Sequence, residues 1–111
     1  MSNMSELKRQ LDQLVEHLKG YGAEKIILFG SAARGDMDAY SDVDVVVIKP
    51  TTMDFVERLG DVVRQCPSTL NADILVYTPE EFQRMQEAEN PFLACVLKDG
   101  TVLYEKTQRT S

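Results

Sequence analysis

The chain of 111 residues is long enough for one small domain with a hydrophobic core and too short for two. Hydrophobic residues make up 43% of it, which excludes an intrinsically disordered chain. Because 18 Asp and Glu outnumber 12 Lys and Arg, the net charge is -6, and we expect no direct nucleic-acid binding through bulk positive charge.

The elements of the first half follow from apolar spacing. Apolar side chains at helical spacing predict a helix over residues 5–19, ended by Gly20 and Gly22. The short apolar runs Lys25–Phe29 and Val43–Ile48 predict two strands that are buried on both faces. A second helical stripe begins at Phe55 and continues up to Cys66.

The second half combines apolar runs with capping signals. A third strand is predicted over Ala72–Tyr77, and a short final strand over Thr101–Glu105. Between them, Thr78 followed by Pro79 predicts a helix start, and Asn90 followed by Pro91 repeats the device. This order predicts an α/β (α+β) fold in which helices cover a small mixed sheet. Residues 1–105 are expected to form this domain, and residues 106–111 a polar flexible tail.

Connection lengths predict which strand ends meet. A helix separates the second and third strands, so these two are expected to be parallel, with their first residues on the same side of the sheet. Only about a dozen residues separate the first and second strands, so an antiparallel pairing is at least as favourable as a parallel one. The end of the first strand would then lie beside the starts of the other two.

Three carboxylates fall at that predicted edge. Asp42 and Asp44 stand two residues apart at the start of an apolar strand, so both side chains point to the same face. Asp73 enters from the third strand. Carboxylates gathered this closely repel one another unless a cation lies between them. Three hard oxygen donors without a His or Cys cluster favour Mg²⁺, with Mn²⁺ as the alternative.

A phosphate-binding turn is expected next to these acids. Gly30 and Ser31 follow the first strand directly; glycine allows a close backbone approach, and the hydroxyl of Ser31 adds a donor. Arg34 would add a fixed positive charge. Alone, a Gly-Ser turn is weak evidence for phosphate binding.

The run GSAARGDMDAYSDVDVVV resembles the signature of the nucleotidyltransferase superfamily that includes DNA polymerase β and the aminoglycoside nucleotidyltransferases. Asp73 in ADILVY matches the third acid of that family. The short chain and its ending NPFLACVLKDGTVLYE are similar to the minimal nucleotidyltransferases, the antitoxin partners of HEPN-domain RNase toxins. The resemblance implies a nucleotidyltransferase (polymerase β palm-like) fold.

The resemblance also implies an activity and a partner. AMP would pass from ATP to a hydroxyl, in this branch a tyrosine of the toxin, and diphosphate would leave. Asp42, Asp44 and Asp73 would be catalytic and hold two ions, while Gly30 and Ser31 bind the β- and γ-phosphates. Such a small site would be completed by the toxin or by self-association, giving a hetero- or homo-oligomer.

Two other functions remain open. The first is a non-catalytic antitoxin that neutralises its partner by occlusion, and the second is transfer to a small-molecule hydroxyl of the aminoglycoside type. The second would require an acceptor-binding domain, which we do not expect from this sequence.

The remaining polar and sulfur-containing residues have ordinary explanations. Asp36 and Asp38 are expected to be turn acids, and His17 a partly exposed helix residue. Cys66 and Cys95 are too few for a disulfide framework, lack zinc-site spacing, and are expected in the core. No apolar run approaches the roughly 18 residues of a membrane span, so we expect a cytoplasmic protein without membrane contact.

Overall fold

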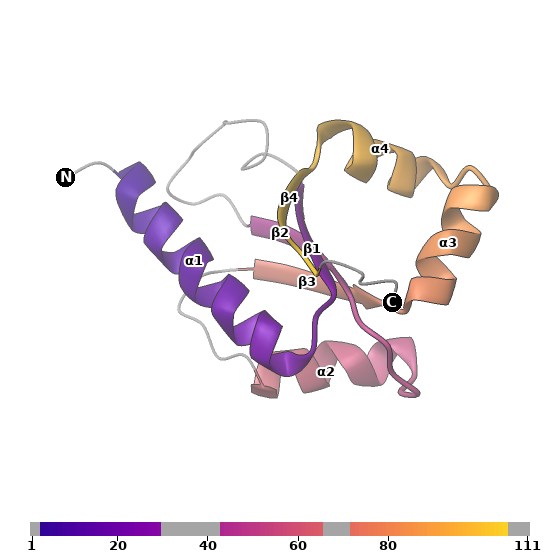
Figure 1. The fold of residues 1–111 in the computed structure, drawn as a ribbon, viewed down its shortest axis with the longest axis horizontal. Helices are drawn as coiled ribbons and strands as arrows, with labels where there is room; N and C mark the ends of the chain where they lie inside the picture. Colours follow the sequence, from indigo (N-terminus) through magenta and orange to yellow (C-terminus); the bar gives the residue numbers. More distant parts are fainter. Residues whose placement is uncertain (1–2, 30–42, 66–71, 107–111) are drawn as a thin grey trace, which may run out of the picture.

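The computed structural model describes residues 3–29, 43–65 and 72–106. Helices and strands alternate along these residues much as the sequence predicts, and the mixed α/β fold is confirmed (Figure 1). In chain order the elements are α1 (Asn3–Tyr21), β1 (Lys25–Phe29), β2 (Val43–Ile48), α2 (Phe55–Gln65), β3 (Ala72–Tyr77), α3 (Pro79–Glu87), α4 (Pro91–Asp99) and β4 (Thr101–Glu105).

The four strands form one sheet in the order β3-β2-β1-β4. β2 and β3 are parallel, as the helix between them predicts. β1 pairs antiparallel with β2, which decides between the two arrangements that the short connection allowed. β4 also pairs antiparallel with β1, so the sheet is mixed. The last residue of β1 therefore lies beside the first residues of β2, and those lie beside the start of β3.

Helices cover both faces of the sheet (Figure 1). α1 and α2 bury apolar side chains such as Leu18 and Val62 against one face. α3 and α4 bury Phe82, Leu93 and Val96 against the other. Because both faces are covered, residues of β1 and β2 that point either way are buried, which is why these strands read as continuous apolar runs.

Helix ends follow the capping signals, with one shift. Thr78 and Glu81 form a complete capping box at the start of α3, and the Asn90 side chain accepts the backbone N–H groups of Phe92 and Leu93 at the start of α4. α1 extends from Asn3 to Tyr21, beyond the predicted residues 5–19. It ends where Gly22 adopts a φ of 112°, a left-handed conformation that glycine tolerates.

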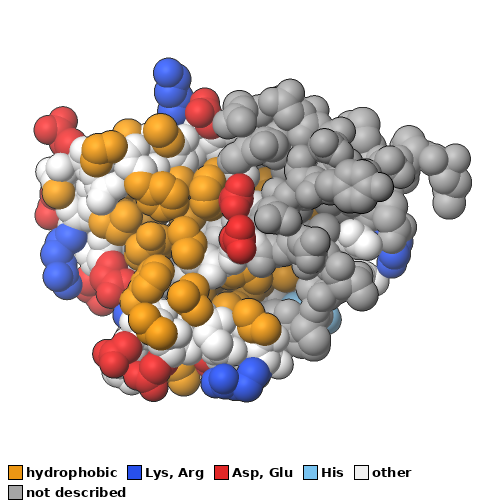
Figure 2. Space-filling view, turned by 180° about the vertical axis from the view of Figure 1, so that it is seen from behind, with side chains coloured by type: hydrophobic (Ala, Val, Ile, Leu, Met, Phe, Trp, Pro, Cys, Tyr) orange, Lys and Arg blue, Asp and Glu red, His pale blue; other side chains and the backbone are white. Residues whose placement is uncertain are grey.

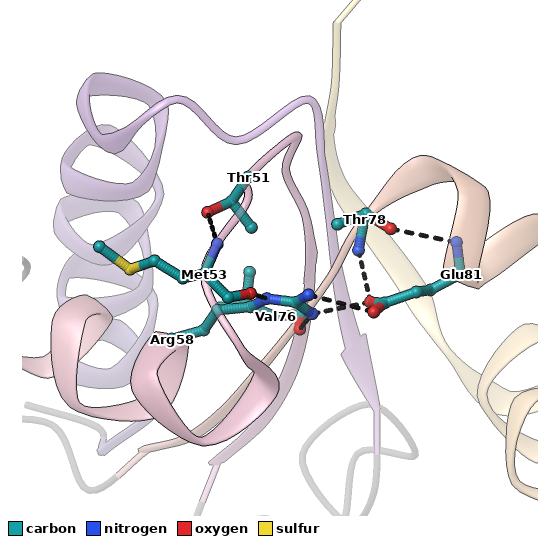
Figure 3. A network of polar contacts seen from close by, with 6 residues as sticks. All are labelled: Thr51, Met53, Arg58, Val76, Thr78 and Glu81. Carbon is teal, nitrogen blue, oxygen red and sulfur yellow. Dashed lines mark hydrogen bonds and ion pairs between the residues drawn. The ribbon is translucent and has the colours of Figure 1, made fainter.

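An internal ion pair joins α2 to the start of α3 (Figure 3). The guanidinium of Arg58, which is 5% exposed, donates to Oε1 and Oε2 of Glu81 at 2.7 and 3.1 Å. It also donates to the backbone carbonyl oxygens of Met53 and Val76 at 2.8 and 3.1 Å. Glu81 in turn accepts the backbone N–H of Thr78 at 2.9 Å. One buried arginine thus ties the loop before α2, the strand β3 and the capping box of α3 together.

Two expectations about single residues have opposite outcomes. His17 is exposed on α1, as expected of a residue off the apolar stripe. The expectation that Cys95 is a core residue is wrong, because its side chain is exposed. On α4 the buried positions are Leu93 and Val96, and a residue at position 95 points away from the face that they share. Cys66 lies outside the described residues. Within those ranges, no helix is long and apolar enough to cross a membrane.

Candidate functional site

Two of the expected catalytic acids face each other across neighbouring strands. Asp44 on β2 and Asp73 on β3 are register partners in the parallel pair, so their Cα atoms are nearest neighbours on adjacent strands. Side chains alternate along a strand, and Asp44 therefore points to the same face as Val46 and Ile48, the face that α3 and α4 cover. Asp44 is partly buried and Asp73 is exposed. The two residues thus occupy neighbouring positions at the start of both strands, on one face.

The end of β1 borders the same place. Phe29 is the register partner of Asp44 in the antiparallel pair, and Gly30 follows it in the chain. Of the residues expected to form the site, Asp44 and Asp73 are described and lie together. Asp42, Gly30, Ser31 and Arg34 lie outside the described residues, so their positions remain predictions.

The pair of carboxylates fits a hard divalent cation. Adjacent strands lie about 4.8 Å apart, so carboxylates at facing positions can reach one ion together. Within residues 3–29, 43–65 and 72–106, no group of three or more His, Cys, Asp or Glu residues is placed to hold a metal. Asp44 and Asp73 supply two of the three expected carboxylates, and Asp42 stands two residues before the first of them in the chain.

We expect the exchange of Asp73 for asparagine to stabilise the metal-free protein. Like charges at facing positions of a sheet oppose folding, so removing one should raise the free energy of unfolding by about 0.2–1 kcal/mol in EDTA. The melting temperature should then rise by about 1–5 °C. Added Mg²⁺ should raise the melting temperature of the wild type more than that of Asp73→Asn, because the variant loses an ion ligand. A variant that melts below the wild type in EDTA would contradict this expectation. Thermal unfolding followed by circular dichroism measures both effects.

Sequence patterns did not predict an aromatic pair beside Asp44. The rings of Phe29 and Phe92 meet edge to face, with centroids 5.5 Å apart and planes at 85°. Phe92 stands at the start of α4, more than 60 residues after Phe29 in the chain. Its position directly after the Asn90-Pro91 cap was visible in the sequence, but its proximity to Asp44 depends on how α4 packs on β1.

A hollow among the described residues lies at the other end of the sheet. It has a volume of about 280 Å³ and is lined by Phe55, Tyr77, Glu81, Arg84 and Met85. Tyr77 is the last residue of β3, whereas Asp73 is near its start, so this hollow is separate from the pair of carboxylates. Burial, and then the nearby charge of Glu81, raise the pKa of the Tyr77 hydroxyl above its ordinary value. The raised pKa favours the protonated phenol.

Known proteins resemble this chain over nearly its whole length. The family model described as polymerase beta, nucleotidyltransferase matches residues 12–109. A protein of Methanocaldococcus jannaschii with the name "putative protein adenylyltransferase" is 31% identical over 105 residues, which cover 94% of this chain and 100% of that protein.

Two crystal structures share the fold. A "putative nucleotidyltransferase" from Sulfolobus solfataricus has a TM-score of 0.62 at 24% identity, covering 92% of this chain and 86% of that one. A toxin-antitoxin with AMP-PNP has a TM-score of 0.57 at 20% identity, covering 87% and 74%. The matched residues 12–109 include Asp44, Asp73 and all four strands of the sheet. The chain therefore belongs to the polymerase beta nucleotidyltransferase family.

Proposed function

We propose that this protein is a metal-dependent nucleotidyltransferase that transfers AMP from ATP to a tyrosine hydroxyl of a cognate HEPN-domain RNase toxin. The observation that carries the proposal is the facing pair Asp44 and Asp73 in a member of this family. Two carboxylates on one face, at the end of the sheet where β1 leads into Gly30-Ser31, are what a site for a metal-bound triphosphate requires.

The residues of the proposed site divide into ion ligands and phosphate-binding groups. Asp42 and Asp44 would hold both ions, and Asp73 would share one of them. Gly30 and Ser31 would bind the β- and γ-phosphates and keep the leaving group in line, with Arg34 as a helper. Bound Mg²⁺ or Mn²⁺ would neutralise charge on the phosphates and lower the pKa of the acceptor hydroxyl.

The proposed reaction forms one bond and breaks one. The acceptor oxygen bonds to the α-phosphorus of ATP, and the bond from that phosphorus to the oxygen of the diphosphate breaks. The proton of the hydroxyl passes to Asp73, which lies on the flank of Asp44 opposite to β1. Placing the phosphates on the β1 flank and the acceptor on the β3 flank puts attacking and leaving groups on opposite sides of the α-phosphorus, as in-line displacement requires.

The choice of a protein acceptor rests on size and on the relatives. A chain of 111 residues leaves little surface for an acceptor site of its own, so a macromolecular acceptor would bring its own binding surface. The Methanocaldococcus jannaschii relative carries the name of a protein adenylyltransferase, and one structural neighbour is a toxin-antitoxin complex. An AMP group on the toxin would add bulk and negative charge beside its RNase site.

The proposal is tested by incubating the protein with the cognate toxin, ATP and Mg²⁺. Intact-mass spectrometry should show toxin heavier by one or more AMP units, and peptide mapping should place them on tyrosine. The matched control omits Mg²⁺ and contains EDTA. Toxin that keeps its mass under conditions in which the complex forms would reject the proposed activity.

A further inference from the structure

We infer that Phe92, with Phe29 behind it, forms the platform on which the purine base of the bound nucleotide rests. This inference rests on the proposed function, because it takes ATP as the donor. The observation behind it is the position of the aromatic pair: Phe29 is the register partner of Asp44, and the ring of Phe92 meets that of Phe29 at 5.5 Å.

The alternation of the strands places the pair on the correct face. Phe29 packs with the residues that α3 and α4 cover, as does Val46, two residues after Asp44. Facing residues of an antiparallel pair have Cβ atoms about 5 Å apart, so the ring of Phe29 and the carboxylate of Asp44 start from adjacent positions on one surface. A nucleotide whose phosphates lie at Asp44 would therefore have aromatic surface next to it.

The two strands beside Asp44 also separate the place of the nucleotide from that of the acceptor. Asp44 has Phe29 on one side and Asp73 on the other. The proposed function assigns the triphosphate to the side of β1, whose last residue leads directly into Gly30-Ser31, and the acceptor to the side of Asp73. The aromatic pair lies on the side of the phosphates, and the base is covalently part of that ligand. A tyrosine ring of the toxin would enter from the other side.

Phe92 is presented to solvent by a fixed helix start. Its side chain is 37% exposed, although Leu93 beside it is buried. Its backbone N–H donates to Oδ1 of Asn90 at 2.9 Å, and Pro91 occupies the first turn of α4. A ring held on a capped helix end loses little freedom when a base stacks on it, which favours binding. Hydrophobic side chains gather over the face seen in Figure 2, with acidic side chains where this area meets the residues that are not described.

The experiment compares two ligands that share their phosphates. Binding of Mg²⁺-ATP and of Mg²⁺-tripolyphosphate to the full chain is measured by calorimetry, without toxin. Phe92→Ala should weaken ATP binding about tenfold, the usual effect of removing one base-stacking ring. Tripolyphosphate, which has no base, should bind the variant as it binds the wild type. Phe92→Trp should keep or improve ATP affinity, since it retains an aromatic face.

Phe55→Ala is the matched control. Phe55 is also 37% exposed and also contacts another ring, that of Tyr77, with centroids 5.5 Å apart, but it lies at the other end of the sheet. It should leave the affinity for both ligands unchanged. The inference is overturned if Phe92→Ala weakens both ligands equally, or if it leaves ATP affinity intact and instead slows transfer to the toxin, which would assign the ring to the acceptor.

The failure of this inference is distinct from the failure of the proposed function. A wild type that binds ATP but never modifies the toxin would reject the transfer reaction, and the Phe92→Ala comparison would still decide where the base lies. A wild type that binds neither ATP nor tripolyphosphate, both alone and with the toxin added, would overturn both.

Discussion

Asp44→Asn is expected to reduce AMP transfer to the toxin about a thousandfold, which corresponds to about 4 kcal/mol of transition-state stabilisation. In the proposed site this carboxylate would hold the ions, so its loss would weaken charge neutralisation on the attacking and the leaving side together. Asparagine keeps the shape of the side chain and one oxygen ligand, so the fold should be retained. Single-turnover transfer of labelled AMP at saturating toxin measures the effect.

A surface aspartate provides the control for lost charge. Asp12 on α1 forms an exposed ion pair with Lys8 at 3.6 Å, and its side chain is 70% exposed. Because such pairs contribute little to stability, Asp12→Asn should transfer AMP at the wild-type rate. If Asp44→Asn is as active as Asp12→Asn, the carboxylate does not act in catalysis and the proposed site is wrong.

The same variant separates catalysis from occlusion. If the protein neutralises the toxin by AMP transfer, Asp44→Asn should bind the toxin and leave its RNase active. If it neutralises the toxin by covering the RNase site, the variant should inhibit as well as the wild type. Toxin RNase activity, measured with and without ATP at equal concentrations of each protein, distinguishes the two. Inhibition that needs no ATP would favour occlusion.

Local patterns predicted the elements of the fold because the apolar spacing and the capping residues of each helix or strand lie in consecutive residues. The β1 and β2 strands read as apolar runs because both of their faces are buried. The starts of α3 and α4 followed from Thr78 and Asn90, whose side chains cap the helices that they precede. The pairing of Asp44 with Asp73 was also predictable, because a helix between two strands implies that they run parallel and start at the same edge.

Contacts between distant residues were not predictable in this way. An acidic stretch such as residues 80–89 is typical of a solvated helix face, but within it Glu81 binds Arg58, which is 23 residues earlier in the chain. An arginine within a helical stripe has no sequence signal for burial. The contact between Phe29 and Phe92 likewise depends on the packing of α4 on β1. The exposure of Cys95 depends on which face of α4 packs against the sheet.

Arg58→Met is expected to lower the free energy of unfolding by about 2 kcal/mol, and the melting temperature by about 9 °C. The methionine keeps the apolar stem of the side chain but removes the guanidinium donors to Glu81, Met53 and Val76. The carbonyl oxygen of Val76 then loses a buried donor, whereas the Glu81 carboxylate, whose side chain is 35% exposed, keeps the backbone N–H of Thr78 and contact with water. Chemical denaturation at neutral pH measures the loss. The dependence of the free energy of unfolding on denaturant concentration should be the same in the variant and the wild type.

Arg64→Met is the matched control on the same helix. The side chain of Arg64 is 71% exposed and its ion pair with Asp61 is 3.6 Å long. The partner Asp61 is only 10% exposed, but it also accepts the hydroxyl of Tyr21 at 2.9 Å and so keeps a hydrogen bond without Arg64. A pair with one exposed member at this distance contributes about 0–1 kcal/mol, so the control should unfold close to the wild type. Equal losses from Arg58→Met and Arg64→Met would mean that the buried network contributes no more than a surface charge.

The pH dependence of stability gives a second measurement of the same network. The hydrogen bonds from Arg58, supported by the backbone N–H of Thr78 and opposed by burial, hold the pKa of Glu81 below its ordinary value of 4.5. The unfolded chain therefore binds the proton more tightly than the folded protein. The stabilisation from Glu81 is present above pH 4.5 and is lost as the pH falls through the lower folded pKa.

The difference in stability between the wild type and Glu81→Gln should consequently shrink as the pH falls towards about 3. In the Arg58→Met background this difference should depend much less on pH, because the main cause of the lowered pKa is absent. A difference that is unchanged between neutral and acidic pH would show that the Arg58–Glu81 pair does not lower the pKa of Glu81 in the folded protein.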